Sequence, residues 1–116
     1  MKVDEIKPFG KKIDVLVKAV EKQEPREVVA RLDNTTHRVS EALVGDETGC
    51  ILLTLWDDTI NQVEGGKTYQ VTNGYSTTFK NSLRLNIGRY GKIGESTEEI
   101  SKANKENNLS EKELSG

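Results

Sequence analysis

A short helical pattern interrupts a chain that otherwise consists of strand-like segments. In DDTINQVEGG, residues 57–66, Asp57 or Asp58 is suited to cap the N-terminus of a helix. Ile60 and Val63 lie three residues apart and so share one helical face, and the closing glycine pair favours the end of the helix. The sequence therefore predicts one helix of about two turns at this point.

Five strand-like segments surround this helix. They are residues 11–22, 37–44, 50–56, 67–74 and 82–88. In the first, third and fifth segments the large apolar side chains of one parity predict a side that faces the core. In the second segment Val39 and Leu43 compete with Ala42 and Val44, so its inward face stays open.

The connections between these segments favour antiparallel pairing. GDETG, residues 45–49, has a glycine at each end, which suits positive-φ positions of a hairpin turn with Asp46 and Glu47 in solvent. Pro25 interrupts the first extended stretch before residues 26–32 resume it. These features predict strands joined by tight turns.

Five strands with one helix between the third and the fourth predict an all-β fold, the five-stranded OB-fold Greek-key barrel. SH3-like barrels lack a helix at that position, and immunoglobulin-like sandwiches need about seven strands or more. The 116 residues are 34% hydrophobic, enough for one small core, which we assign to residues 1–94. Residues 95–116 carry six glutamates and three lysines with few large apolar side chains, so we expect a flexible acidic tail.

Several classes of protein are excluded by what the chain contains. One cysteine, Cys50, and one histidine, His37, provide neither an internal disulfide nor a zinc ligand set, and we expect no cofactor or metal. No nucleophile, base and orienting group converge, and no phosphate-cradling glycine loop is present, so we expect no enzyme. The sequence shows neither a membrane-length apolar run nor a secretory signal, which predicts a cytoplasmic protein without membrane contact.

The aromatic residues point to a binding surface. Trp56 ends the third segment on the parity opposite to the core set, and Tyr75 and Phe79 flank the connection between the fourth and fifth segments. We expect all three rings to reach one groove, where each can stack on a nucleobase. The surrounding side chains expected to contact the strand are Lys80, Arg84 and Arg38 for phosphates, and Asn86 and Thr54 for hydrogen bonds. The competing interpretation is structural, with each ring packed under the helix, over the barrel end or across a hairpin.

The segments SEALVGDETGCILLTLWDD and GYSTTFKNSLRLNIGRYGKIGE extend this argument. They resemble the archaeal single-OB single-stranded DNA-binding proteins and their human relatives, which are kin of replication protein A. The resemblance covers roughly residues 5–95. It implies that Trp56, Tyr75 and Phe79 stack on bases and that Lys80 contacts a phosphate.

The chain also departs from the family pattern. Asn86 stands where some relatives have a further aromatic residue, and the stretch VVARLDNTTH is poorer in Lys and Arg than in others, which implies moderate affinity. Family tails recruit other proteins, so the resemblance implies replication or repair proteins as partners of residues 95–116.

We therefore predict a non-enzymatic binder of single-stranded DNA that coats exposed strands in replication, recombination or repair without marked sequence preference. Two alternatives remain open from the residues. One is an RNA-binding OB protein, because stacking does not distinguish the two sugars. The other is a protein-interaction OB subunit of a replication or repair complex.

Overall fold

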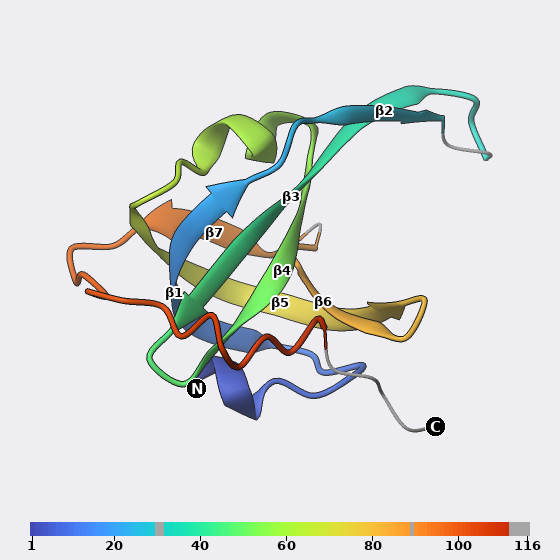
Figure 1. The fold of residues 1–116 in the computed structure, drawn as a ribbon. Coiled ribbons are helices and arrows are strands. Elements are labelled where there is room, and N and C mark those ends of the chain that lie inside the picture. The colour runs from blue at the N-terminus through green and yellow to red at the C-terminus, as the bar shows by residue number, and fades with distance from the viewer. Residues whose placement is uncertain (30–31, 89, 112–116) are drawn as a thin grey trace.

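A computed structural model describes residues 1–29, 32–88 and 90–111. Its elements are the 3-10 helix η1 (Val3–Glu5), β1 (Ile13–Lys22), β2 (Arg26–Val29), β3 (Thr36–Asp46), β4 (Gly49–Trp56), the 3-10 helix η2 (Asp57–Gln62), β5 (Thr68–Phe79), β6 (Ser82–Asn86) and β7 (Lys92–Glu95). In Figure 1, β2 and the first part of β3 extend away from the rest of the sheet as an arm, and η2 lies at one end of the sheet.

The seven strands that the structure describes belong to one sheet that closes on itself. Neighbours follow the order β1-β3-β4-β6-β5-β7, and β1 also pairs with β5, which completes a ring. Among the strands of the described residues, β4 and β6 pair in parallel and the other pairs are antiparallel. The five predicted strands correspond to β1, β3, β4, β5 and β6, with η2 between the third and fourth of them, and the predicted OB-type fold class is confirmed. The strands β2 and β7 add to it by pairing with β3 and β5.

The core lies inside the ring. The predicted inward side chains of β1, β4 and β6 are buried, namely Ile13, Val15, Val17, Ala19, Ile51, Leu53, Leu55, Leu83 and Leu85. In β3 the open question is answered by Ala42 and Val44, which face the core, whereas Val39 is buried on the other side of the strand. Ile60 and Val63 of the η2 region are buried as well and close one end of the core, as their spacing predicts.

The helix itself differs from the prediction. It is a 3-10 helix without a side-chain cap, and Trp56 occupies the N-cap position. Asp57 has a φ of 48°, and its carboxylate accepts hydrogen bonds from the Arg38 backbone N–H at 3.0 Å and pairs with His37 Nδ1 at 2.9 Å. Asp57 therefore ties η2 to β3 instead of capping the helix. Among the described residues, no helix is long and apolar enough to cross a membrane.

The β3–β4 hairpin forms as predicted, but for another reason. Neither Gly45 nor Gly49 has a positive φ. A Cβ on Gly45 would lie 2.4 Å from the carbonyl oxygen of Gly49, so the two glycines permit close approach of the strands. Asp46 is buried and not solvated, because its carboxylate accepts from the Val3 N–H at 3.0 Å and the Thr48 N–H at 2.9 Å.

The strand β5 is longer than the sequence suggests. It was expected to end at Gly74, but it continues to Phe79, so Tyr75 and Phe79 lie within the strand and do not flank a loop. The turn to β6 consists of Lys80 and Asn81, with φ values of 52° and 65°. Two successive positive φ values are those of a two-residue hairpin turn. The polar residues of this stretch therefore decorate a paired strand.

The segment after β7 lies against the sheet. Cys50 donates its N–H to the Asn107 carbonyl at 2.9 Å, and Leu109 donates its N–H to the Cys50 carbonyl at 2.8 Å. Leu109 and Ser110 are buried, and the Ser110 hydroxyl accepts from the Leu52 N–H at 2.8 Å. The expected flexible tail is thus a bonded strap over residues 96–111, which bonds to Thr68 of β5 near its start and runs beside β4 near its end (Figure 1). Residues 112–116 lie outside the described residues.

Candidate nucleic-acid interface

A groove of about 260 Å³ lies on the outer face of the sheet, and we call it the sheet groove. Its lining residues come from β2 to β6 and are Arg26, Val28, Val39, Glu41, Thr54, Trp56, Thr77, Thr78, Phe79, Arg84 and Asn86. Strand register explains the set apart from Thr78, because residues paired directly across neighbouring strands point to the same face. Trp56 pairs with Val39, and Thr54 pairs with both Glu41 and Asn86.

The three predicted stacking residues are exposed on this outer face. Trp56 is 44% exposed, Phe79 is 56% exposed and Tyr75 is 38% exposed. Tyr75 pairs with Asn86 and shares its strand parity with Thr77 and Phe79. The alternative in which these rings pack into the core does not agree with these positions.

The rings are nevertheless divided between two cavities. Trp56 and Phe79 both line the sheet groove, whereas Tyr75 lines a neighbouring cavity. Thr77 lines both and lies between Tyr75 and Phe79 along β5. The sequence predicts one common groove for the three rings, whereas the structure has two adjoining cavities on one face.

Two cations lie beside the Phe79 ring. The Nζ of Lys80 is 5.5 Å from the ring centroid, and the guanidinium carbon of Arg84 is 5.6 Å from it. Both distances allow a cation–π attraction, which helps to fix the ring in the groove. The arrangement also places positive charge next to an exposed aromatic surface, as the sequence predicts for Lys80 and Arg84.

A buried carboxylate that sequence reasoning missed lies in the same groove. Glu41 is only 7% exposed, and it forms an ion pair with Arg84 and another with Arg26 at 3.5 Å. Burial lowers the pKa of Arg84 from its ordinary value, and the neighbouring charge of Arg26 lowers it further. Glu41 offsets part of the positive charge expected to bind phosphates. Glu41 has the same strand parity as Val39. The sequence did not decide which parity of this strand faces the core, so the position of Glu41 could not be predicted.

The other predicted contact residues have different positions. Thr54 and Asn86 line the sheet groove, and the Asn86 side-chain amide donates to the Thr77 hydroxyl at 3.0 Å. Arg38 has the opposite strand parity from Val39 and Glu41, and it does not line the groove. Within the described residues, no group of three His, Cys, Asp or Glu side chains is arranged to hold a metal ion.

Comparison with known proteins extends these observations. The family model for single-stranded DNA binding protein Ssb-like, OB fold, matches residues 6–95. The chain is 36% identical over 98 residues to the single-stranded DNA binding protein Ssb of Saccharolobus solfataricus, covering 84% of this chain and 65% of that protein. The chain thus spans just under two thirds of that relative's length.

Solved structures give the same fold. A hypothetical protein from Arabidopsis thaliana matches with a TM-score of 0.80 and 31% identity, over 100% of this chain and 86% of that one. The second OB-fold domain of replication protein A from Methanococcus maripaludis matches with a TM-score of 0.69 and 22% identity, over 87% and 98% of the two chains. From its outer-face groove, its closed sheet and these matches, the chain belongs to the Ssb-like family of OB-fold single-stranded DNA binding proteins.

Proposed function

We propose that this protein binds single-stranded DNA by stacking bases on Trp56 and Phe79 in the sheet groove and on Tyr75 in the adjoining cavity. The observation that carries the proposal is the exposure of these three rings on one outer face of the sheet. Exposed apolar surface of this kind marks an interaction site. A base offers a π-face to each ring, and each stack contributes about 1–3 kcal/mol.

The proposal concerns unpaired strands. Stacking on a ring needs a free face of the base, and in a duplex neighbouring base pairs cover both faces. The rings also have no preference among the four bases, because every base has a π-face. We therefore expect binding without marked sequence preference and weak binding to duplex DNA.

Charge has a secondary role in the proposed mode. Lys80 next to Phe79 is exposed and can reach a phosphate, whereas Arg84 is paired with Glu41. The whole chain has a formal net charge of -2, so binding by phosphate attraction alone is unfavourable. The proposed binding therefore depends on stacking first and on phosphate contacts second.

The same surface suits a protein that coats exposed strands during replication or repair and has no catalytic step of its own. Its protein partners, in this proposal, contact the C-terminal strap, where Glu98, Glu99 and Glu106 are exposed. These carboxylates offer negative charge to basic surfaces of replication or repair proteins.

Tryptophan fluorescence tests the proposal directly. Trp56 is the only tryptophan of the chain, so quenching reports on one position in the sheet groove. We expect titration with oligo-dT of about 12 nucleotides, within the roughly 4–16 that one OB fold covers, to quench the signal. A matched duplex serves as the control and is expected to leave the fluorescence almost unchanged.

Two outcomes would contradict the proposal. Absence of quenching with every oligonucleotide would leave a protein-interaction subunit as the better reading. Tighter binding of a matched RNA in competition with the DNA would assign the groove to RNA, because stacking alone does not separate the two sugars.

A further inference from the structure

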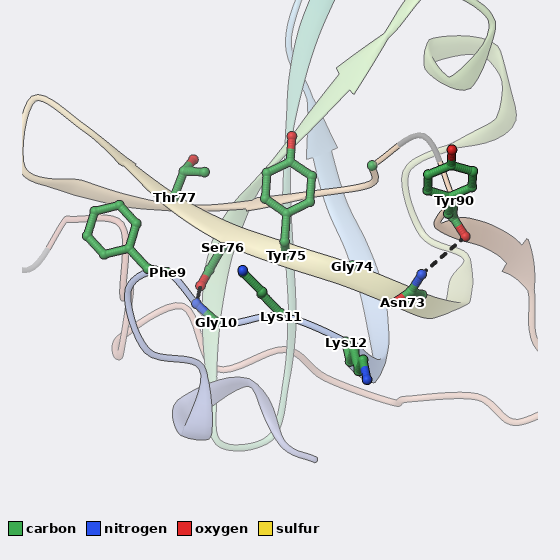
Figure 2. A pocket seen from close by; sticks show the side chains of 11 residues that line it. Phe9, Gly10, Lys11, Lys12, Asn73, Gly74, Tyr75, Ser76, Thr77 and Tyr90 are labelled. Atoms are coloured by element: carbon green, nitrogen blue, oxygen red, sulfur yellow. Dashed lines mark hydrogen bonds between the residues drawn. The ribbon is translucent and has the colours of Figure 1, made fainter.

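The cavity that Tyr75 lines is larger than the sheet groove. It has a volume of about 560 Å³ and lies between the segment before β1, the strand β5 and the segment after β6. Its side chains include two further aromatic rings, Phe9 and Tyr90, and two lysines, Lys11 and Lys12 (Figure 2). We call it the Tyr75 cavity.

Hydrogen bonds to Ser76 build one wall of this cavity. Gly10 donates its N–H to the Ser76 hydroxyl at 2.7 Å, and Ser76 donates its N–H to the Gly10 carbonyl at 3.0 Å. The Ser76 hydroxyl also donates to the Lys7 carbonyl. The chain from Lys7 to Gly10 is therefore fixed against β5, next to Tyr75.

This attachment holds Phe9 in an uncommon position. Phe9 has a φ of 60°, which is unfavourable for a bulky residue, and its side chain is 71% exposed. Neither a favourable backbone conformation nor burial in the core accounts for a phenylalanine at this position. Backbone strain of this kind is often found where a side chain is presented to a ligand.

The other side of the cavity carries Tyr90, which is 80% exposed. Its carbonyl accepts a hydrogen bond from the Asn73 side-chain amide at 3.4 Å, so β5 also supports this segment. Gly88 leaves room for the Tyr75 ring, because a Cβ there would lie 2.9 Å from Tyr75 Cε1. In Figure 2, Tyr75 stands between Phe9 on one side and Tyr90 on the other.

The charge of the Tyr75 cavity differs from that of the sheet groove. Among the described residues that line it, Lys11 and Lys12 are charged and none is acidic. Both lysines are exposed, and neither has a carboxylate partner among the ion pairs of the described residues. The sheet groove instead contains Glu41 between two arginines.

We propose that the Tyr75 cavity is a second subsite for the same single strand, with Phe9 and Tyr90 as additional stacking surfaces and Lys11 and Lys12 as phosphate contacts. Thr77, shared by the two cavities, marks the path by which the strand passes from the sheet groove. The volume of the Tyr75 cavity is within the range of roughly 300–1,000 Å³ that is typical of ligand pockets. The inference rests on the proposed function, since it extends the strand that the sheet groove holds.

The length of the oligonucleotide separates the two subsites. A strand of about 4 nucleotides fits within the sheet groove, whereas one of about 14 nucleotides also extends into the Tyr75 cavity. In the double variant Phe9→Ala with Tyr90→Ala, we expect the dissociation constant of the long oligo-dT to rise roughly 5- to 150-fold for each stack lost, and that of the short one to stay unchanged. Trp56 fluorescence measures both.

Matched controls guard against indirect effects. Leu32→Ala removes a fully exposed apolar side chain that lines neither cavity, and it should leave both dissociation constants unchanged. Lys11→Gln with Lys12→Gln should make the salt slope of the long oligonucleotide shallower by about 1.4, from about 0.7 per phosphate contact. Lys92→Gln, an exposed lysine on β7, should not change that slope.

The failure of this inference differs from the failure of the proposed function. If the wild-type protein binds but the Phe9 and Tyr90 variant shows no loss specific to long strands, the second subsite is rejected and the sheet groove remains. If the wild-type protein binds no oligonucleotide, the function itself is rejected. A melting curve matching that of the wild type shows that the variant is folded.

Discussion

Glu41 and Arg84 form an ion pair inside the groove that is proposed to bind DNA. The pair lies beside the exposed rings and leaves the guanidinium less available to a phosphate. Arg26 contacts the same carboxylate from β2, at 3.5 Å. The electrostatic character of the groove is therefore set by one acidic residue between two arginines.

Replacing Glu41 by Gln should make binding more dependent on phosphate contacts. Freeing one or both arginines should steepen the slope of log K against log salt by about 0.7 to 1.4. The free energy of unfolding should fall by roughly 1–3 kcal/mol, because a nearly buried partner of Arg84 is lost. Glu27→Gln, at an exposed position of β2, is the control. An unchanged slope would show that the arginines do not contact the strand.

Removing either ring of the sheet groove should weaken binding. We expect Trp56→Ala or Phe79→Ala to reduce the affinity for oligo-dT by about 1–3 kcal/mol each. Labelled DNA and fluorescence anisotropy provide the measurement, since the first variant lacks the intrinsic signal. Phe79→Tyr keeps a stacking face and should bind like the wild type. Unchanged affinity of both alanine variants, with intact melting curves, would reject the assigned groove.

The wild-type protein should show a shallow salt dependence. Roughly three or four phosphate contacts at about -0.7 each predict a slope of about -2 to -3 for log K against log salt. A titration series in increasing NaCl measures it. A slope steeper than about -5 would indicate binding led by charge and contradict a mode based on stacking.

The C-terminal strap offers a test of the fold. Leu109→Ala should lower the free energy of unfolding by roughly 2–5 kcal/mol, because Leu109 is buried against the core cluster. The amides of Cys50 and Leu52, which bond to the strap, should then exchange hydrogen faster. Glu106→Ala, at an exposed position, is the control. Rapid exchange at both amides in the wild type would show that the strap does not stay bound in solution.

Much of the fold could be predicted from the alternation of apolar side chains. In β1 and β4 one parity is apolar and buried, so strand and face both follow from the pattern. In β3 the pattern does not predict the inward face, because residues of both parities are buried. One parity faces the core, and the other lines the groove that contains Glu41. The strap was missed because backbone hydrogen bonds to Cys50 hold it, and composition does not reveal such bonds.

The candidate site could also be predicted only in part from the sequence. The position of Trp56 at the end of a strand with a clear core face placed its ring correctly outside. Arg38 was misplaced because the parity of β3 was unknown. Phe9 and Tyr90 escaped notice because each is a single aromatic residue in a polar segment far from the others in sequence. Only the folded chain brings them beside Tyr75.

The continuity of β5 has a consequence for which strands bind best. Tyr75, Thr77 and Phe79 occupy alternate positions in the part of β5 that pairs with β6, so the ladder sets their spacing before the ligand arrives. The loss of freedom on association then falls mainly on the polynucleotide. A pliable homopolymer of thymidine should adapt to this template more easily than one of adenosine, whose bases must first leave their own stacks.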